Sequence, residues 1–103
     1  MILVNTDFIT GKEIETLEVV KGSTVRSKHV GKDILSSLKT IVGGELTSYK
    51  EMIDEARQIA VKRMVDEAKG LGADGVINIR YATSNIMQGA AEILVYGTAV
   101  KFK

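Results

Sequence analysis

Residues 90–102 read AAEILVYGTAVKF, and this stretch decides the fold. Its β-branched and aromatic residues favour a strand, in which successive side chains point to opposite faces of a sheet. Both of these faces are apolar, with Leu94, Tyr96, Val100 and Phe102 on one and Ile93, Val95 and Ala99 on the other. We therefore expect a strand that is buried on both sides.

Before this strand, the spacing of the apolar residues changes twice, from the alternation of a strand to the spacing of a helix and back again. We expect strands at 2–4, 13–28 and 75–83, helices at 31–42 and 48–71, and a polar loop at 84–89. Small alanines on the second helix would let it lie close against the sheet, and Gly22 marks an expected bulge in the long strand. In the strand at 75–83, alternation would place Ile77, Ile79 and Tyr81 on one face.

These elements predict a single α+β domain spanning residues 1–103. Their order is strand, strand, helix, helix, strand, strand, which predicts a four-stranded, mainly antiparallel sheet with both helices on one face. The helices would leave the other face uncovered, although burying its four large side chains is worth about 1.5–3 kcal/mol each. We therefore expect a homo-oligomeric ring in which copies of the chain cover this face. The alternative is that the long second strand curls over the same face within one chain.

The composition excludes several classes of protein. The chain contains no cysteine, which rules out disulfides and thiolate nucleophiles and suits a cytoplasmic location. No stretch approaches the ~20 apolar residues of a membrane-spanning helix. In the most basic segment, 21–39, five basic residues stand against Asp33, too few for strong nucleic-acid binding. We therefore expect neither a membrane nor a nucleic acid as a partner.

The best candidate for an anion site is the start of the first predicted helix. Its cationic and glycine residues are Arg26, Lys28, Gly31 and Lys32. Free amides of a first helical turn, the helix dipole and nearby cations together can hold a phosphate or a carboxylate. In the alternative interpretation these are ordinary solvated residues, and Asp33 already complements the dipole.

His29 is the only imidazole in the chain and offers the single route to a transition-metal site. Ring symmetry would bring several His29 copies together, or His29 would pair with Asp33 four residues later. The alternative is an exposed histidine without a function. An active site has weaker support, because no serine or carboxylate stands in a recognisable catalytic motif.

Residues 70–75 read GLGADG and match the dinucleotide-binding fingerprint in letters only. The functional motif follows a strand and opens a helix, so that helix amides face the phosphate. Here the motif closes a predicted helix and opens a strand. We therefore expect no nucleotide at this position, and we expect the Asp74 carboxylate to accept hydrogen bonds from nearby turn amides.

Several short segments form a pattern whose order and spacing are more specific than any one segment. They are 19–25, 33–34, 41–44, 56–57, 71–76 and 97–100, with Tyr49, Ala60 and Ala68 between them. In this pattern the chain resembles, nearly end to end, the YbjQ-like family of small bacterial and archaeal proteins, which is catalogued under a heavy-metal-binding label. The resemblance implies a dodecin-like subunit in a pentameric ring, with a divalent or heavy-metal ion as ligand. Tyr49 and Arg57 match the family's second helix, where we expect packing or an ion pair between subunits, with a ligand contact as the alternative.

These observations lead to an expected function. We expect a non-enzymatic, cytoplasmic homo-oligomer, without an assigned cellular role, that binds a metal or small ligand in or between its subunits. The alternative is an anion-binding or regulatory module at the start of the first helix. An enzyme of unspecified class is the third possibility.

Overall fold

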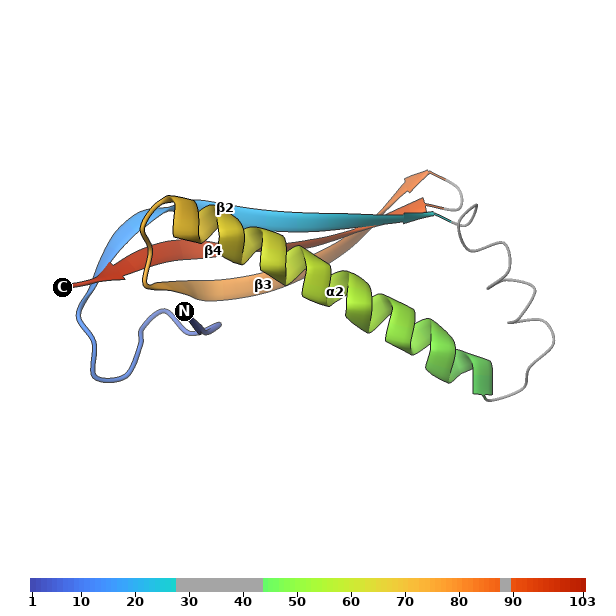
Figure 1. Cartoon of the computed structure of the whole chain (residues 1–103), viewed down its shortest axis with the longest axis horizontal. Helices are drawn as coiled ribbons and strands as arrows, with labels where there is room; N and C mark the ends of the chain where they lie inside the picture. The colour runs from blue at the N-terminus through green and yellow to red at the C-terminus, as the bar shows by residue number, and fades with distance from the viewer. Residues whose placement is uncertain (28–43, 88–89) are drawn as a thin grey trace.

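A computed structural model gives the fold and describes residues 1–27, 44–87 and 90–103. Four strands form one sheet, and helix α2 (Gly44–Gly70) crosses one of its faces (Figure 1). The strands are β1 (Ile2–Leu3), β2 (Ile14–Ser27), β3 (Gly75–Met87) and β4 (Ala90–Phe102). The predicted α+β class is confirmed, and the predicted helix at 31–42 lies outside the described residues.

The strands lie in the order β1-β3-β4-β2. Strand β4 is antiparallel to both β2 and β3, but β1 runs parallel to β3. The sheet is therefore mixed, and our prediction of a mainly antiparallel sheet was wrong. The reason is that no hairpin joins β1 to β2. The connecting residues instead cross the face of the sheet opposite α2, where Ile9 is buried. Strand β2 then runs in the same direction as β1.

Two predicted boundaries also differ from the structure. Strand β3 continues to Met87 and β4 begins at Ala90, so the polar loop predicted at 84–89 is mostly strand. Polar residues are tolerated there because the side chains of residues 81–86 are exposed. Helix α2 begins at Gly44, four residues before the predicted start, and ends at Gly70, one residue before the predicted end.

A β-bulge in β2 decides which of its side chains face the helix. The register of β2 against β4 shifts between Thr16 and Val19, so the bulge lies at Leu17 and Glu18. Our prediction of a bulge at Gly22 was therefore wrong. Gly22 stays in regular register, and its missing side chain instead allows the α2 backbone to approach.

A second bulge lies in β3. The register shifts between Ile77 and Arg80, and Asn78 has a φ of 54°, a left-handed conformation that asparagine tolerates better than most residues. The bulge turns Ile77 away from α2 and Ile79 toward it, because each packs in a different cluster of the core. Our prediction that Ile77, Ile79 and Tyr81 share one face was therefore wrong.

Helix α2 packs mainly on β2 and β4. Its stripe of Ala56, Ala60, Met64 and Ala68 is fully buried, which confirms that small residues bring the helix close to the sheet. The core on this side also contains Val20, Val76, Val95 and Ala99. Two hydrogen bonds fasten the helix to β2: Thr24 Oγ1 donates to the Ala56 carbonyl at 3.0 Å, and Arg63 Nη1 donates to the Ser23 carbonyl at 2.6 Å.

The face of the sheet opposite α2, here called the far face, is covered at one end by the chain itself. Ile9, Ile77 and Val100 form a buried cluster there, with Val4, Ile14 and Phe102 packed around it. The burial of β4 on both sides is thus confirmed at Val100. The covering segment is the connection before β2, and not a curled β2. Farther along the far face, Val19 is 70% exposed and Tyr96 is 37% exposed.

A search of residues 1–27, 44–87 and 90–103 finds no helix that is long and apolar enough to cross a membrane.

Candidate functional site

Most of the predicted site residues fall outside the part of the chain that the structure describes. Lys28, His29, Gly31, Lys32 and Asp33 lie within 28–43, so neither the anion site nor the metal site can be assembled from them. Tyr49 belongs to α2, but its side chain is outside the description. Arg26 and Arg57 are the two predicted site residues whose side chains are described.

Arg26 lies near the end of β2, opposite Ala91 of β4. It follows Gly22 and Thr24 in alternation, so its side chain emerges on the α2 side of the sheet. The Nε atom of Arg26 is buried and has no hydrogen-bond partner among the described residues. A buried guanidinium donor without an acceptor is costly, and an anion would satisfy it.

Arg57 lies on the exposed surface of α2. Its Nη1 donates to Asp54 Oδ1 at 3.0 Å, and the two side chains are 51% and 47% exposed. The observed ion pair therefore joins two residues of one helix, three positions apart. An exposed pair of this kind orders the side chain only weakly and leaves Arg57 available to other partners.

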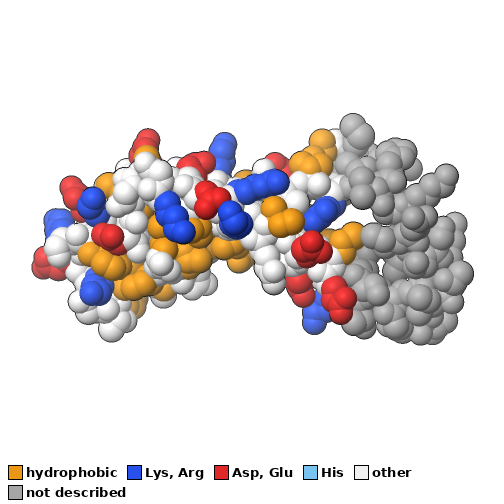
Figure 2. Space-filling model, viewed as in Figure 1, with side chains coloured by type: hydrophobic (Ala, Val, Ile, Leu, Met, Phe, Trp, Pro, Cys, Tyr) orange, Lys and Arg blue, Asp and Glu red, His pale blue; other side chains and the backbone are white. Residues whose placement is uncertain are grey.

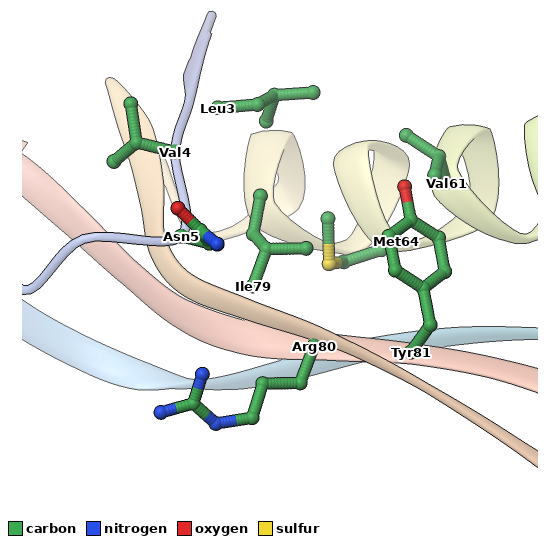
Figure 3. Close-up of a pocket in the computed structure, with 8 residues that line it drawn as sticks. All are labelled: Leu3, Val4, Asn5, Val61, Met64, Ile79, Arg80 and Tyr81. Carbon is green, nitrogen blue, oxygen red and sulfur yellow. The ribbon is translucent and has the colours of Figure 1, made fainter.

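An open groove of about 600 Å³ lies between α2, β3 and the N-terminal residues. It is lined by Leu3, Val4, Asn5, Val61, Met64, Ile79, Arg80 and Tyr81 (Figure 3). In the view of Figure 1, apolar side chains gather beside α2 over this part of the sheet (Figure 2). The groove arises because α2 lies over β2 and β4 and leaves β3 largely uncovered. Tyr81, for example, is 57% exposed.

Two local features of the sequence shape the groove. The Asn78 bulge turns Ile79 toward the α2 side, where it forms part of the groove wall. Gly97 makes room for it, since a Cβ atom there would lie 2.7 Å from Val76 Cγ1 and 3.2 Å from Ile79 Cγ1. Sequence reasoning missed the groove because strict alternation keeps Ile79 and Tyr81 on the same face as Ile77. The bulge instead moves them to the α2 side of the sheet.

The chemistry of the groove is mainly apolar. The Tyr81 ring points toward Met64 and Val61, whereas the Arg80 side chain extends away from them (Figure 3). The polar side-chain groups within reach are the Tyr81 hydroxyl and the Asn5 amide, and no carboxylate or imidazole is among the lining residues. The groove therefore suits a neutral ligand and offers no general base for catalysis.

Metal ligands do not gather in the described part of the chain. Within residues 1–27, 44–87 and 90–103, no group of three histidine, cysteine, aspartate or glutamate residues lies close enough to hold a metal ion. The described residues therefore do not fit a resident metal ion. A site built from His29 and Asp33 stays a prediction.

Comparison with known proteins places this fold in a family. The YbjQ family model, described as "Putative heavy-metal-binding", matches residues 1–103. The chain belongs to the YbjQ family. The resemblance seen in the sequence is thus confirmed over the whole chain.

Curated relatives in the YbjQ family are named UPF0145 proteins. The relative from Clostridium novyi (strain NT) is 76% identical over 98% of both chains. That from Alkaliphilus metalliredigens (strain QYMF) is 72% identical over 99% of both chains. An archaeal relative, from Methanosarcina acetivorans, is 58% identical over 98% of this chain and 96% of its own. None of these names states an activity.

A solved structure shares the fold. It is the crystal structure of a protein of unknown function of the DUF74 family from Pediococcus pentosaceus ATCC 25745. The two structures superpose with a TM-score of 0.71 over 100% of this chain and 98% of that one, at 16% sequence identity. At this identity the similarity shows the fold alone.

Proposed function

We propose that the protein is a non-enzymatic, ligand-binding subunit of a homo-oligomer, and that the groove beside α2 holds the ligand. The groove is the observation that carries the proposal. Its volume of about 600 Å³ lies within the range of small-molecule sites, which is roughly 300–1,000 Å³. Its apolar walls and two polar groups also match the usual make-up of such sites.

The charge of the lining indicates the class of ligand. A charged group buried against Leu3, Val61 and Met64 would lose its hydration without gaining a partner. The Arg80 guanidinium is directed away from these residues and so does not compensate an anion there (Figure 3). The ligand is therefore neutral and largely apolar, with one or two groups that hydrogen-bond to Tyr81 and Asn5.

Titration with Nile red, a neutral and largely apolar dye, tests the groove. Tyr81→Ser removes the aromatic ring that forms an exposed part of the groove lining, and it is expected to weaken dye binding at least fivefold. The matched control is Tyr96→Ser, which removes a tyrosine from the far face and is expected to leave binding unchanged. Equal binding by Tyr81→Ser and the parent protein would exclude the groove, and a loss in Tyr96→Ser alone would move the site to the far face.

The oligomer is supported by the half of the far face that none of the described residues covers. Val19, Val25 and Tyr96 are exposed there, beyond the end that the N-terminal connection covers. Copies of the chain would bury these side chains, and we propose the pentameric ring that the family resemblance implies. Native mass spectrometry is expected to show a species of five chains. A single chain at micromolar concentration would contradict the oligomer and leave the groove unaffected.

A second candidate function is anion binding at Arg26, which its buried and unpartnered Nε favours. A thermal-shift titration with phosphate and sulfate is expected to stabilise the parent protein but not Arg26→Gln. Arg57→Gln is the control, because Arg57 is exposed and lies on the helix surface. Stabilisation that survives Arg26→Gln would exclude this residue.

The family description also requires a direct test of metal binding. We propose His29 and Asp33 as the ligands, contributed by several subunits. Elemental analysis of untagged protein is expected to show stoichiometric metal that is lost in His29→Ala. Metal that persists in this variant would place the site elsewhere.

A further inference from the structure

Among the described residues, the sheet has two outer edges, and at each edge a long strand is paired on one side only over all or part of its length. Strand β2 is the last strand in the order, so its outer side has no neighbour among the described strands. On the opposite edge, the N-terminal residues cover only the first part of β3. Their last hydrogen bonds run from the Asn78 amide to the Thr6 carbonyl and from the Ile79 amide to the Val4 carbonyl. Beyond Ile79, β3 continues to Met87, and β4 is the one described strand beside it.

The backbone directions along these edges follow from the hydrogen bonds. Because the Ile79 amide points away from β4, alternation directs the amides of Tyr81, Thr83 and Asn85 to the same outer side. In β2, the Ser23 carbonyl accepts from Arg63, which indicates that Ser23 also faces outward. Its alternate neighbours, Lys21 and Val25, then face outward as well.

We propose that residues 80–87 of β3 pair with the outer edge of β2 from a second copy of the chain, so that subunits join head to tail. This inference rests on the proposed homo-oligomer and names its interface. A free edge presents amides and carbonyls that another strand readily satisfies, and on β2 the Ser23 carbonyl is already occupied by Arg63. The chain contains no proline, so no residue of either strand lacks the amide that a ladder requires.

The side chains along the two edges favour this occupant. Exposed β-branched and aromatic residues flank both strands: Val19 and Val25 on β2, and Tyr81 and Ile86 on β3. Cross-strand pairs of these types stabilise a sheet. The charges of β2 cancel, because Glu15 and Glu18 are balanced by Lys21 and Arg26, and the one charged residue between 80 and 87 is Arg80. Charge therefore does not select the pairing. A ring of copies instead requires a contact between two different surfaces, which β2 against β3 provides and pairing of identical edges does not.

The interface joins two different surfaces, and this has a consequence for assembly. Each subunit that uses its β3 edge still offers its β2 edge to the next copy. Contacts of this head-to-tail type close into a ring when the rotation between neighbours allows it. Edge pairing therefore supplies a physical route to the proposed ring and removes both free edges of the sheet.

Amide hydrogen exchange of the unmodified protein tests the pairing. In the oligomer, the amides of Tyr81, Thr83 and Asn85 are expected to exchange at least a hundredfold more slowly than in an unstructured peptide. Exchange at unprotected rates, in a protein that native mass spectrometry shows to be oligomeric, would overturn the edge pairing and leave the homo-oligomer standing. A monomer would overturn both.

Two proline variants test the head-to-tail arrangement. Thr83→Pro blocks the β3 edge and Lys21→Pro blocks the β2 edge, and neither removes an amide that points to β4. Each variant alone is expected to be a folded monomer, as judged by circular dichroism and native mass spectrometry. Mixing them is expected to give a dimer of one chain of each kind, because one intact edge of each type remains.

The outcome of mixing distinguishes the possible arrangements. If β2 paired with β2, Thr83→Pro would still dimerise alone, and mixing would add nothing. Either that result or a mixture that stays monomeric would overturn the head-to-tail contact. If a proline variant does not fold, the exchange measurement on the parent protein still decides the question.

Discussion

Gly22 of β2 lies directly against Ala60 of α2, so close that an added Cβ atom would overlap the Ala60 carbonyl oxygen. The same atom would lie 2.5 Å from the Met64 amide nitrogen. Because these neighbours are helix backbone, no rotamer change can relieve the overlap. We expect Gly22→Ala to lower the free energy of unfolding by about 3 kcal/mol, the upper end for an overpacked core. Urea denaturation measures the change.

Gly70 provides the matched control for this substitution. No atom lies within 4 Å of a Cβ built on Gly70, and its φ is not in the left-handed region. Gly70→Ala is therefore expected to change the unfolding free energy by less than about 1 kcal/mol, and a gain would reflect the lower entropy of the unfolded chain. Similar stabilities for the two variants would contradict the close contact between α2 and β2.

Asp74 connects the end of α2 to the last strand. Its Oδ2 accepts from the Phe102 amide at 2.8 Å, and its own amide donates to the Val100 carbonyl at 2.8 Å. Our expectation that Asp74 serves local turn amides was therefore wrong, since its partner is 28 residues away. We expect Asp74→Ala to cost about 1.5–3 kcal/mol, the range for a hydrogen bond to a charged group. Asp74→Asn keeps an acceptor oxygen and should cost less; equal losses would argue against the hydrogen bond.

Asn78 tests the bulge that shapes the groove. Its φ of 54° is free of strain only for glycine and is tolerated by asparagine. We expect Asn78→Gly to be nearly neutral and Asn78→Val to lower the unfolding free energy by about 1–2 kcal/mol, the cost of a left-handed conformation. Thermal denaturation measures both variants. A valine variant as stable as the parent would contradict the bulge.

The sequence predicted the elements whose burial follows a regular period. The alanine stripe of α2 and the end of that helix near Gly70 are as expected, and so is the burial of Val100 on the second face of β4. Errors arose where one residue breaks the period. Asn78 moves the side chains of residues 79–85 to the other face, before a second register shift between Asn85 and Met87, and nothing in the neighbours of Asn78 signals a bulge.

The candidate site was predicted less well for a related reason. Charge and helix-end chemistry selected Arg26, which lies on β2 with a buried Nε, and its role as a ligand contact stays a prediction. The groove depends on three segments that are distant in the sequence, and on α2 lying over β2 and not β3. Periodicity assigns a side chain to a face of the sheet, but it does not tell which strands the helix leaves uncovered.

Substitution of Arg57 distinguishes an ion pair within α2 from a contact between subunits. Its ion pair with Asp54 lies on an exposed helix surface, where solvent screens the attraction and side-chain ordering opposes it. We expect Arg57→Ala to change the unfolding free energy by at most about 0.5 kcal/mol, and a double-mutant cycle with Asp54→Ala to give a coupling of similar size. The control is Lys62→Ala, which removes an exposed pair of the same kind with Asp66, 3.0 Å long, from the same helix. Native mass spectrometry of both variants completes the test, because a loss of the oligomer in Arg57→Ala alone would show that this residue bridges subunits and would contradict a purely local pair.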